Sequence, residues 1–197
     1  MLNTIKLLFF MEALLLIAFA IFTFSLRKQE REVVKWSYVA LAASVPVVGL
    51  FGGSQNVFYA FTFGLPFLAL GDRRRLACIY ALMLPLFPDL GGPYVIASIY
   101  LGDFSAWKAL NLGALLSLLA TSGRRGARVP AMERSLWMFF FIGVAIVARG
   151  LPLAGTVRLV ALTFLTVIPP FYIMARCIRT RAEASDVSLF FVLGGMC

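Results

Sequence analysis

The segment TVIPPFYIMARCIRTRAEASD, residues 166–186, contains the pattern that decides the fold. An apolar run ends in two prolines and two aromatic residues, and a polar stretch with three arginines separates it from the next apolar run, which begins at Val187. Proline has no main-chain N–H and stops or kinks a helix. The pair therefore predicts that a helix ends here, at the edge of a polar loop.

The same alternation of apolar runs and short polar loops extends along the whole chain. Hydrophobic residues make up 61% of the 197 residues and charged residues only 14%, whereas soluble domains are typically about half apolar and a quarter charged. Apolar runs of about 18 residues or more are typical of membrane spans, and lipid favours helices because they satisfy their own main-chain hydrogen bonds. The sequence predicts one domain over residues 1–197, an all-α polytopic transmembrane helical bundle of about seven to eight spans.

Eight apolar segments can be drawn as spans, with a mixed stretch from Asp89 to Ser105 that we expect to be re-entrant or to lie along the surface. The segments are 5–26, 36–53, 55–71, one from Leu76 that Pro85 and Pro88 interrupt, 106–120, 135–148, 157–174, and an incomplete one from Val187.

Basic residues follow the odd-numbered segments. Those loops contain 14 of the 18 lysines and arginines, in clusters of four, three, four and three. Cytoplasmic loops of membrane proteins are enriched in Lys and Arg, so the pattern predicts a multi-pass protein of the bacterial inner membrane with its N-terminus outside. The net charge of +9 is thereby explained without nucleic acid, which we do not expect as a partner.

Two arginines do not fit this explanation. Arg149 and Arg158 flank the segment GLPLAGTV and are predicted to lie on the external side. The planar guanidinium group binds phosphate oxygens through two parallel hydrogen bonds, so a pair of arginines at one cleft suits a phosphate or pyrophosphate. The alternative is that both side chains extend to lipid headgroups.

Other candidates for chemistry are few. Asp89 and Asp103 are predicted on the same external face, where they would act as a base, bind a cation or simply be solvated, and Glu12 lies inside the first apolar segment. The chain has no histidine, its three cysteines form no CxxC motif, and no nucleophile motif or phosphate-binding loop is found. We therefore predict no metal site and no cofactor.

The segment TVRLVALTFLTVIPPFYIMARCIRTRAEASDVSLFFVLGG, residues 156–195, resembles the middle of bacterial O-antigen ligases and polymerases, within a matching region of roughly residues 80–197. Upstream, IASIYLGDFSAWKALNLGALLSLL is similar to a short hydrophobic loop of that family that enters a span. The features that carry the resemblance are Arg158 at the opening of a span, Pro170-Phe171-Tyr172, the RxIRT motif from Arg176 to Thr180, and the turn from Glu183 to Asp186.

The resemblance implies a membrane glycosyltransferase that takes a glycan from an undecaprenyl-pyrophosphate carrier at the periplasmic face. Membrane lipid and the lipid-linked glycan are then the expected partners, and Arg158 and Arg149 the expected pyrophosphate contacts. The chain lacks the large external loop and the histidine of that family and ends within its eighth apolar segment. It is therefore expected to be the N-terminal part of a longer protein and to be inactive alone.

Two other classes of function stay open. Pro46, Pro66 and Pro85 interrupt apolar segments, as in the broken helices of a transporter or lipid-carrier flippase. Such proteins carry charges deep within several spans, and here Glu12 alone qualifies. The third class is a non-catalytic membrane subunit that packs against a partner chain.

Overall fold

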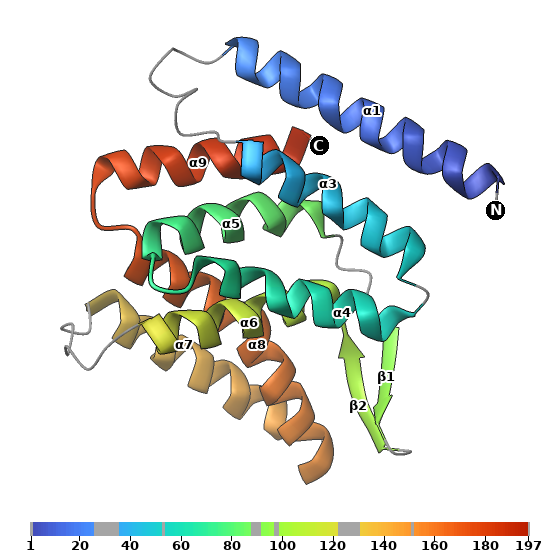
Figure 1. The fold of residues 1–197 in the computed structure, drawn as a ribbon. Coiled ribbons are helices and arrows are strands. Elements are labelled where there is room, and N and C mark those ends of the chain that lie inside the picture. The colour runs from blue at the N-terminus through green and yellow to red at the C-terminus, as the bar shows by residue number, and fades with distance from the viewer. Residues whose placement is uncertain are drawn as a thin grey trace.

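The computed structural model describes residues 2–25, 36–52, 54–87, 92–96, 99–121, 131–150 and 152–196. Helices dominate this part of the chain, as the sequence predicts, and a two-stranded hairpin accompanies them (Figure 1). In chain order the elements are α1 (Leu2–Ser25), α3 (Trp36–Phe51), α4 (Gln55–Gly64), the 3-10 helix η1 (Leu65–Ala69), α5 (Arg73–Leu86), β1 (Gly92–Ile96), β2 (Ile99–Phe104), α6 (Ala106–Thr121), α7 (Ala131–Ala148), α8 (Leu153–Cys177) and α9 (Arg181–Met196).

Capping residues, proline and glycine divide the apolar runs into short helices. The Ser54 hydroxyl caps α4 by accepting a hydrogen bond from the main-chain N–H three residues further on, and Asp72 caps α5 in the same way. Pro66 lies in the first turn of η1, where its missing N–H costs little. Gly71, with φ of +90°, makes the left-handed turn between η1 and α5 that favours glycine.

The core is built around α5. Every residue from Leu76 to Met83 is at most 2% exposed. Helix α9 packs along α5 over most of its length, and α6 packs against α4, η1 and α8 as well as α5 (Figure 1). The apolar side chains that the sequence assigns to lipid-facing spans are therefore partly used to pack helices against one another.

The prediction of a polytopic bundle of seven to eight spans is wrong. Within the described residues one helix, α8, is both long enough and apolar enough to cross a membrane. The remaining apolar helical stretches found there have 10–17 residues. At 1.5 Å per residue they reach about 15–26 Å, which is less than the ~30 Å hydrocarbon core of a bilayer.

The prediction of a multi-pass protein of the bacterial inner membrane is wrong for the same reason, because a single candidate helix does not make a multi-pass protein. The alternation of sides that placed Arg149 and Arg158 on an external face rests on those spans. The positions of both arginines therefore have to be argued from the fold itself.

The prediction that the proline pair ends a helix is also wrong, since α8 runs through Pro169 and Pro170 as far as Cys177. A proline at position 169 leaves the carbonyl of Leu165 without its helical donor. The side-chain amide of Asn111, from α6, donates a hydrogen bond of 2.8 Å to that carbonyl. The neighbouring helix thus replaces part of what the prolines remove.

The mixed stretch after α5 forms a hairpin and not a re-entrant loop. Strands β1 and β2 pair antiparallel, from Gly92 opposite Phe104 to Ile96 opposite Ile99, with an irregularity after Tyr94. The hydroxyl of Tyr59, from α4, donates to the carbonyl of Phe104 at 2.8 Å and fixes the base of the hairpin to the helices.

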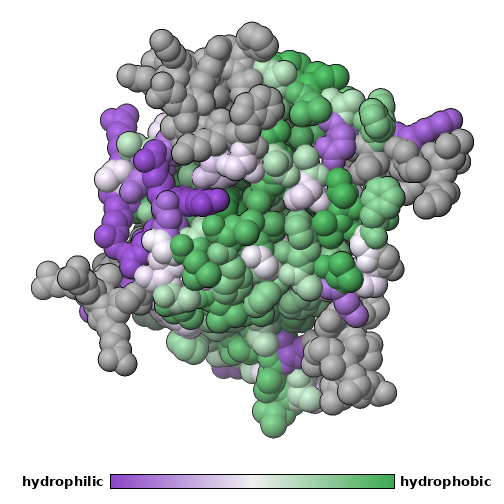
Figure 2. Space-filling model, viewed as in Figure 1, coloured by the Kyte–Doolittle hydropathy of each residue, from purple (hydrophilic) through white to green (hydrophobic). Residues whose placement is uncertain are grey.

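Much of the surface is apolar. Figure 2 shows a broad hydrophobic area across the middle of one face, with hydrophilic residues gathered at the side where α5 and α9 begin. Large apolar side chains on α7 are more than half exposed, among them Met138, Phe139, Phe141, Ile142 and Ile146. An apolar surface of this extent is typical of a site that binds lipid or another protein.

Candidate functional site

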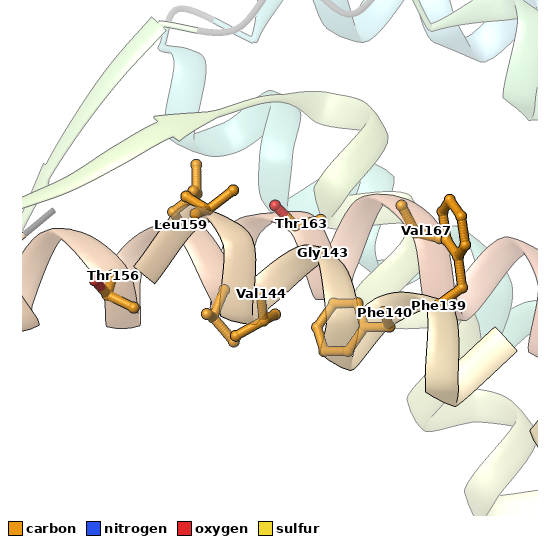
Figure 3. Close-up of a pocket in the computed structure, with 10 residues that line it drawn as sticks. Phe139, Phe140, Gly143, Val144, Thr156, Leu159, Thr163 and Val167 are labelled. Atoms are coloured by element: carbon orange, nitrogen blue, oxygen red, sulfur yellow. The ribbon is translucent and has the colours of Figure 1, made fainter. Parts of the chain in front are cut away.

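A groove between α7 and α8 is the best-formed apolar cavity of the described structure. The lining side chains come from one face of each helix, at spacings of three and four residues (Figure 3). They are Phe139, Phe140, Gly143, Val144 and Val147 from α7, and Thr156, Leu159, Val160, Thr163 and Val167 from α8.

The groove exists because small residues leave space between two helices that pack closely at one end. A Cβ added to Gly143 would meet no atom within 4 Å, so the glycine contributes open space to the groove. One turn earlier on α7, Phe140 is buried and packs edge-on against Phe164 of α8, with ring centroids 6.0 Å apart. The aromatic contact holds the two helices together, and the missing side chain at Gly143 leaves open space between them one turn further along.

The size and lining of the groove suit a hydrocarbon chain. Its volume is about 170 Å³. Among the described residues that line it, only Thr156 and Thr163 are polar, and the Thr156 hydroxyl already donates to the carbonyl of Pro152 at 3.2 Å. An apolar cavity of ~150 Å³ stays dry and accepts small hydrocarbons. From Thr156 to Val167 the groove follows about 16 Å of α8, which is roughly half the thickness of a bilayer core.

Arg149 lies just past the end of α7, in a turn closed by a 3.2 Å hydrogen bond from the Gly150 N–H to the Val147 carbonyl. Its side chain is exposed, and Val147, two residues earlier, lines the groove. The guanidinium group therefore starts from the end of the groove where Thr156 lies. A negatively charged group bound at that end of the groove would lie near the Arg149 guanidinium group.

Arg158 belongs to the same end of the α7–α8 hairpin but to another face of α8. At about 100° per residue it stands roughly 200° around the helix from Thr156, almost opposite the lining residues. Its side chain is half-buried. The structure thus brings both predicted arginines to one end of the α7–α8 hairpin. Arg149 follows the last groove-lining residue of α7 closely, whereas Arg158 is on the face of α8 that points away from the groove.

The predicted acidic residues contribute less. Asp89 lies outside the described residues, and Asp103 is placed by its main chain on β2, opposite Pro93. Glu12 is half-buried on α1, one of its carboxylate oxygens has no hydrogen-bond partner, and burial raises the pKa of the carboxyl group. Glu12 is not among the residues that line the groove. In the part of the chain that the structure describes, no group of three or more Cys, Asp or Glu side chains is placed to hold a metal ion.

Sequence reasoning missed the residues that form the groove. The aromatic run Phe139–Phe141 carries no functional prediction there, and Gly143 and Thr156 are not singled out. A signal was present in the small residues Gly143, Thr156 and Thr163. Small residues on the facing sides of two helices can leave a cavity between them. The pairing of α7 with α8, and hence the groove, depends on their tertiary arrangement.

Comparison of the chain with protein-family models, with curated proteins and with solved structures finds no match. The resemblance to O-antigen ligases and polymerases therefore stays a prediction that rests on the residues themselves.

Proposed function

We propose that this chain binds a lipid phosphate, with the hydrocarbon chain in the groove between α7 and α8 and the phosphate at the end where Arg149 and Arg158 lie. The lipid suggested by the sequence resemblance is a polyprenyl pyrophosphate that carries a glycan. On this proposal the chain is the carrier-binding part of a glycan-transfer protein.

The observation that carries the proposal is the combination of an apolar groove about 16 Å long with an exposed arginine at one end. Lipid phosphates have the same two-part chemistry, a long apolar tail and a compact anionic head. Guanidinium groups bind the head through charge-assisted hydrogen bonds, which are stronger than neutral ones. Burial of each CH₂ of the tail contributes about 0.8 kcal/mol.

The groove supplies binding and charge stabilisation but no proton transfer. None of the described residues that line it has a titratable side chain, so a general acid or base would have to come from elsewhere. In glycan transfer from a pyrophosphate carrier the leaving group gains negative charge as the glycosidic bond breaks. Cationic groups placed where that charge develops lower the barrier, and this is the role we assign to Arg149.

The experiment compares the binding of a fluorescent polyprenyl pyrophosphate and of the matching polyprenol to the purified chain in detergent micelles. Gly143→Leu fills the groove and is expected to weaken both ligands. Ala161→Leu, at an exposed position of α8 outside the groove lining, is its matched control and is expected to weaken neither. Arg149→Gln is expected to weaken the pyrophosphate about tenfold, the effect of a lost hydrogen bond to a charged group, and to leave the polyprenol unchanged.

Equal affinities for both ligands in the wild-type chain would contradict the role of the arginines. Unchanged binding in Gly143→Leu would contradict the groove as the place of the tail. Both experiments can be interpreted on this chain alone, because they measure ligand binding and not glycan transfer.

A further inference from the structure

A second charged region lies at the opposite end of α8. Three helix ends meet there: the start of α5, the end of α8 and the start of α9 (Figure 1). At ~1.5 Å per residue, α8 separates Arg158 from Arg176 by about 27 Å, so this region is distinct from the groove end. We call it the arginine face, and its members are Arg73, Arg74, Arg75, Arg176, Arg179 and Arg181.

The carboxylates of the arginine face are already engaged. Asp72 accepts a hydrogen bond from the Arg75 main-chain N–H at 3.1 Å, and Asp186 forms an ion pair with Arg74. Glu183 accepts from the main-chain N–H groups of Arg179 and Thr180, at 2.7 and 3.0 Å. Two of the three acids therefore hold helix starts together and one pairs with an arginine. Six arginines against three carboxylates leave three positive charges in surplus.

The surplus charge points outward. Arg75, Arg179 and Arg181 are exposed, and none of them forms an ion pair within the described residues. Arg176 is committed elsewhere, since its guanidinium group lies 4.7 Å from the centroid of the Tyr172 ring. These three arginines are consequently available to an external anion, and Figure 2 shows hydrophilic surface at the side where α5 and α9 begin.

Exposed leucines border the arginine face. Leu68 and Leu70 are 53% and 56% exposed, and they immediately precede the turn into α5. Leu119 is 53% exposed near the end of α6, which the Thr121 hydroxyl joins to the same turn by accepting a hydrogen bond of 3.3 Å from the Gly71 N–H. Exposed leucines beside a cationic surface would make no favourable contact with a nucleic acid. They would with a lipid surface, because acyl chains lie directly beneath the anionic headgroups.

We infer that the arginine face binds the anionic headgroups of a lipid surface, with the bordering leucines entering the acyl layer. The inference concerns a different end of the molecule from the proposed lipid-phosphate groove and does not depend on it. It also gives the two helix-start carboxylates, Asp72 and Glu183, a purpose, since they fix helix ends that carry arginines without forming ion pairs with Arg75, Arg179 or Arg181.

The experiment measures flotation of the full chain with phosphatidylcholine vesicles and with vesicles in which one third of the lipid is phosphatidylglycerol. We expect tighter binding to the anionic vesicles, and we expect this increment to fall as salt is raised because exposed charges are screened. Arg181→Gln is expected to reduce the increment about fivefold and Arg75→Gln/Arg181→Gln about 10- to 30-fold, from the usual contribution of a basic residue near an anionic membrane. Binding to phosphatidylcholine alone should not change.

Lys6→Gln is the matched control, because it removes one exposed positive charge from α1, away from the arginine face. An equal loss in Lys6→Gln and Arg181→Gln would show that net charge alone drives binding, and would overturn the inference. A short RNA or DNA duplex that displaces the chain from anionic vesicles at equal phosphate concentration would overturn it as well. Circular dichroism of each variant checks that the helices remain, as expected for exposed side chains.

Discussion

The side-chain amide of Asn111 donates its hydrogen bond to the one carbonyl in α8, that of Leu165, whose helical donor Pro169 has removed. The oxygen of the same amide accepts a hydrogen bond of 2.6 Å from the hydroxyl of Tyr80, in α5. Asn111 and Tyr80 are both fully buried. One asparagine thus connects three helices and satisfies the polar groups that would otherwise be unpaired in the core.

A second polar residue of α6 has a similar task. The hydroxyl of Ser117, also fully buried, donates to the carbonyl of Pro66 at 3.0 Å. That carbonyl belongs to η1, where the chain has left α-helical geometry. A helix that is otherwise apolar therefore carries its few polar side chains at the points where neighbouring helices are broken, because an unpaired buried carbonyl is costly.

Replacement of Asn111 should destabilise the fold strongly. Asn111→Ala leaves the Leu165 carbonyl and the Tyr80 hydroxyl without partners, and we expect a loss of about 2–4 kcal/mol in unfolding free energy, at 1–3 kcal/mol for each buried polar group. Thermal and denaturant unfolding in mild detergent, followed by circular dichroism, measures the loss.

A double-mutant cycle tests the connection to the proline. Pro169→Ala restores a main-chain donor for the Leu165 carbonyl, so Asn111→Ala should cost about 1 kcal/mol less in that background than in the wild-type chain. Strictly additive losses would show that Asn111 does not compensate for Pro169. Pro170→Ala is the matched control, because its nitrogen faces a different carbonyl.

Gly194 permits the closest approach of α9 to α5. A Cβ at this position would lie 2.1 Å from the Leu82 carbonyl oxygen and 2.9 Å from the Pro85 ring. The neighbour that would have to move is main chain of the most buried helix, so Gly194→Ala should cost about 1–3 kcal/mol, as overpacked cores do.

The adjacent residue supplies the control for this substitution. A Cβ at Gly195 would meet no atom within 4 Å, and Gly195→Ala should be neutral or stabilising by up to about 1 kcal/mol, because alanine is the better helix former. Similar melting temperatures for the two variants would contradict the close packing of α9 against α5.

Gly113 plays the same part between α6 and α4. Its Cβ would lie 2.1 Å from the Phe63 carbonyl oxygen, and we expect Gly113→Ala to lower the unfolding free energy by about 1–3 kcal/mol. Gly64, next to Phe63 in the chain, has no atom within 4 Å of an added Cβ. Gly64→Ala should therefore leave the melting temperature unchanged or raise it, and a loss equal to that of Gly113→Ala would contradict the prediction.

The helices could be predicted from the sequence, whereas their lengths and their use could not. Apolar residues that face lipid and apolar residues that face another helix have the same letters, so the runs 36–53 and 55–71 indicate spans although they form α3, α4 and η1. The prolines gave the opposite error: Pro169 and Pro170 predict the end of a helix, but α8 continues through them because Asn111 bonds to the carbonyl that Pro169 leaves unpaired. Asn111 lies 54 residues away from Leu165 along the chain, and no local sequence pattern predicts this contact.

The candidate site was predictable only in its charges. Arg149 and Arg158 stand out in the sequence because they interrupt an apolar region, and the structure places them at one end of a helix pair. The groove depends on the absence of a side chain at Gly143 and on the pairing of α7 with α8. Neither property can be read from composition or spacing, since 16 glycines occur in the chain and nothing in the sequence sets Gly143 apart from the others.

The start of α9 should make stability depend on acid pH. Thr180 and Glu183 form a capping box in which the Thr180 hydroxyl accepts from the Glu183 N–H at 3.2 Å, while the Glu183 carboxylate accepts from two main-chain N–H groups. These hydrogen bonds lower the pKa of Glu183 below its ordinary value of 4.5. A carboxyl group with a lowered pKa stabilises the folded state fully above its unfolded pKa, and the contribution is lost as the pH falls through the folded pKa.

We therefore expect the melting temperature of the wild-type chain to fall more steeply than that of Glu183→Gln as the pH is lowered from about 6 to about 3. Glutamine keeps an oxygen acceptor for the helix start but does not titrate, so the two melting curves should differ at neutral pH and converge in acid. The arginine face should respond in parallel, because the same box positions Arg179 and Arg181. Parallel pH profiles for the two proteins would show that the Glu183 carboxylate is not stabilised by the start of α9.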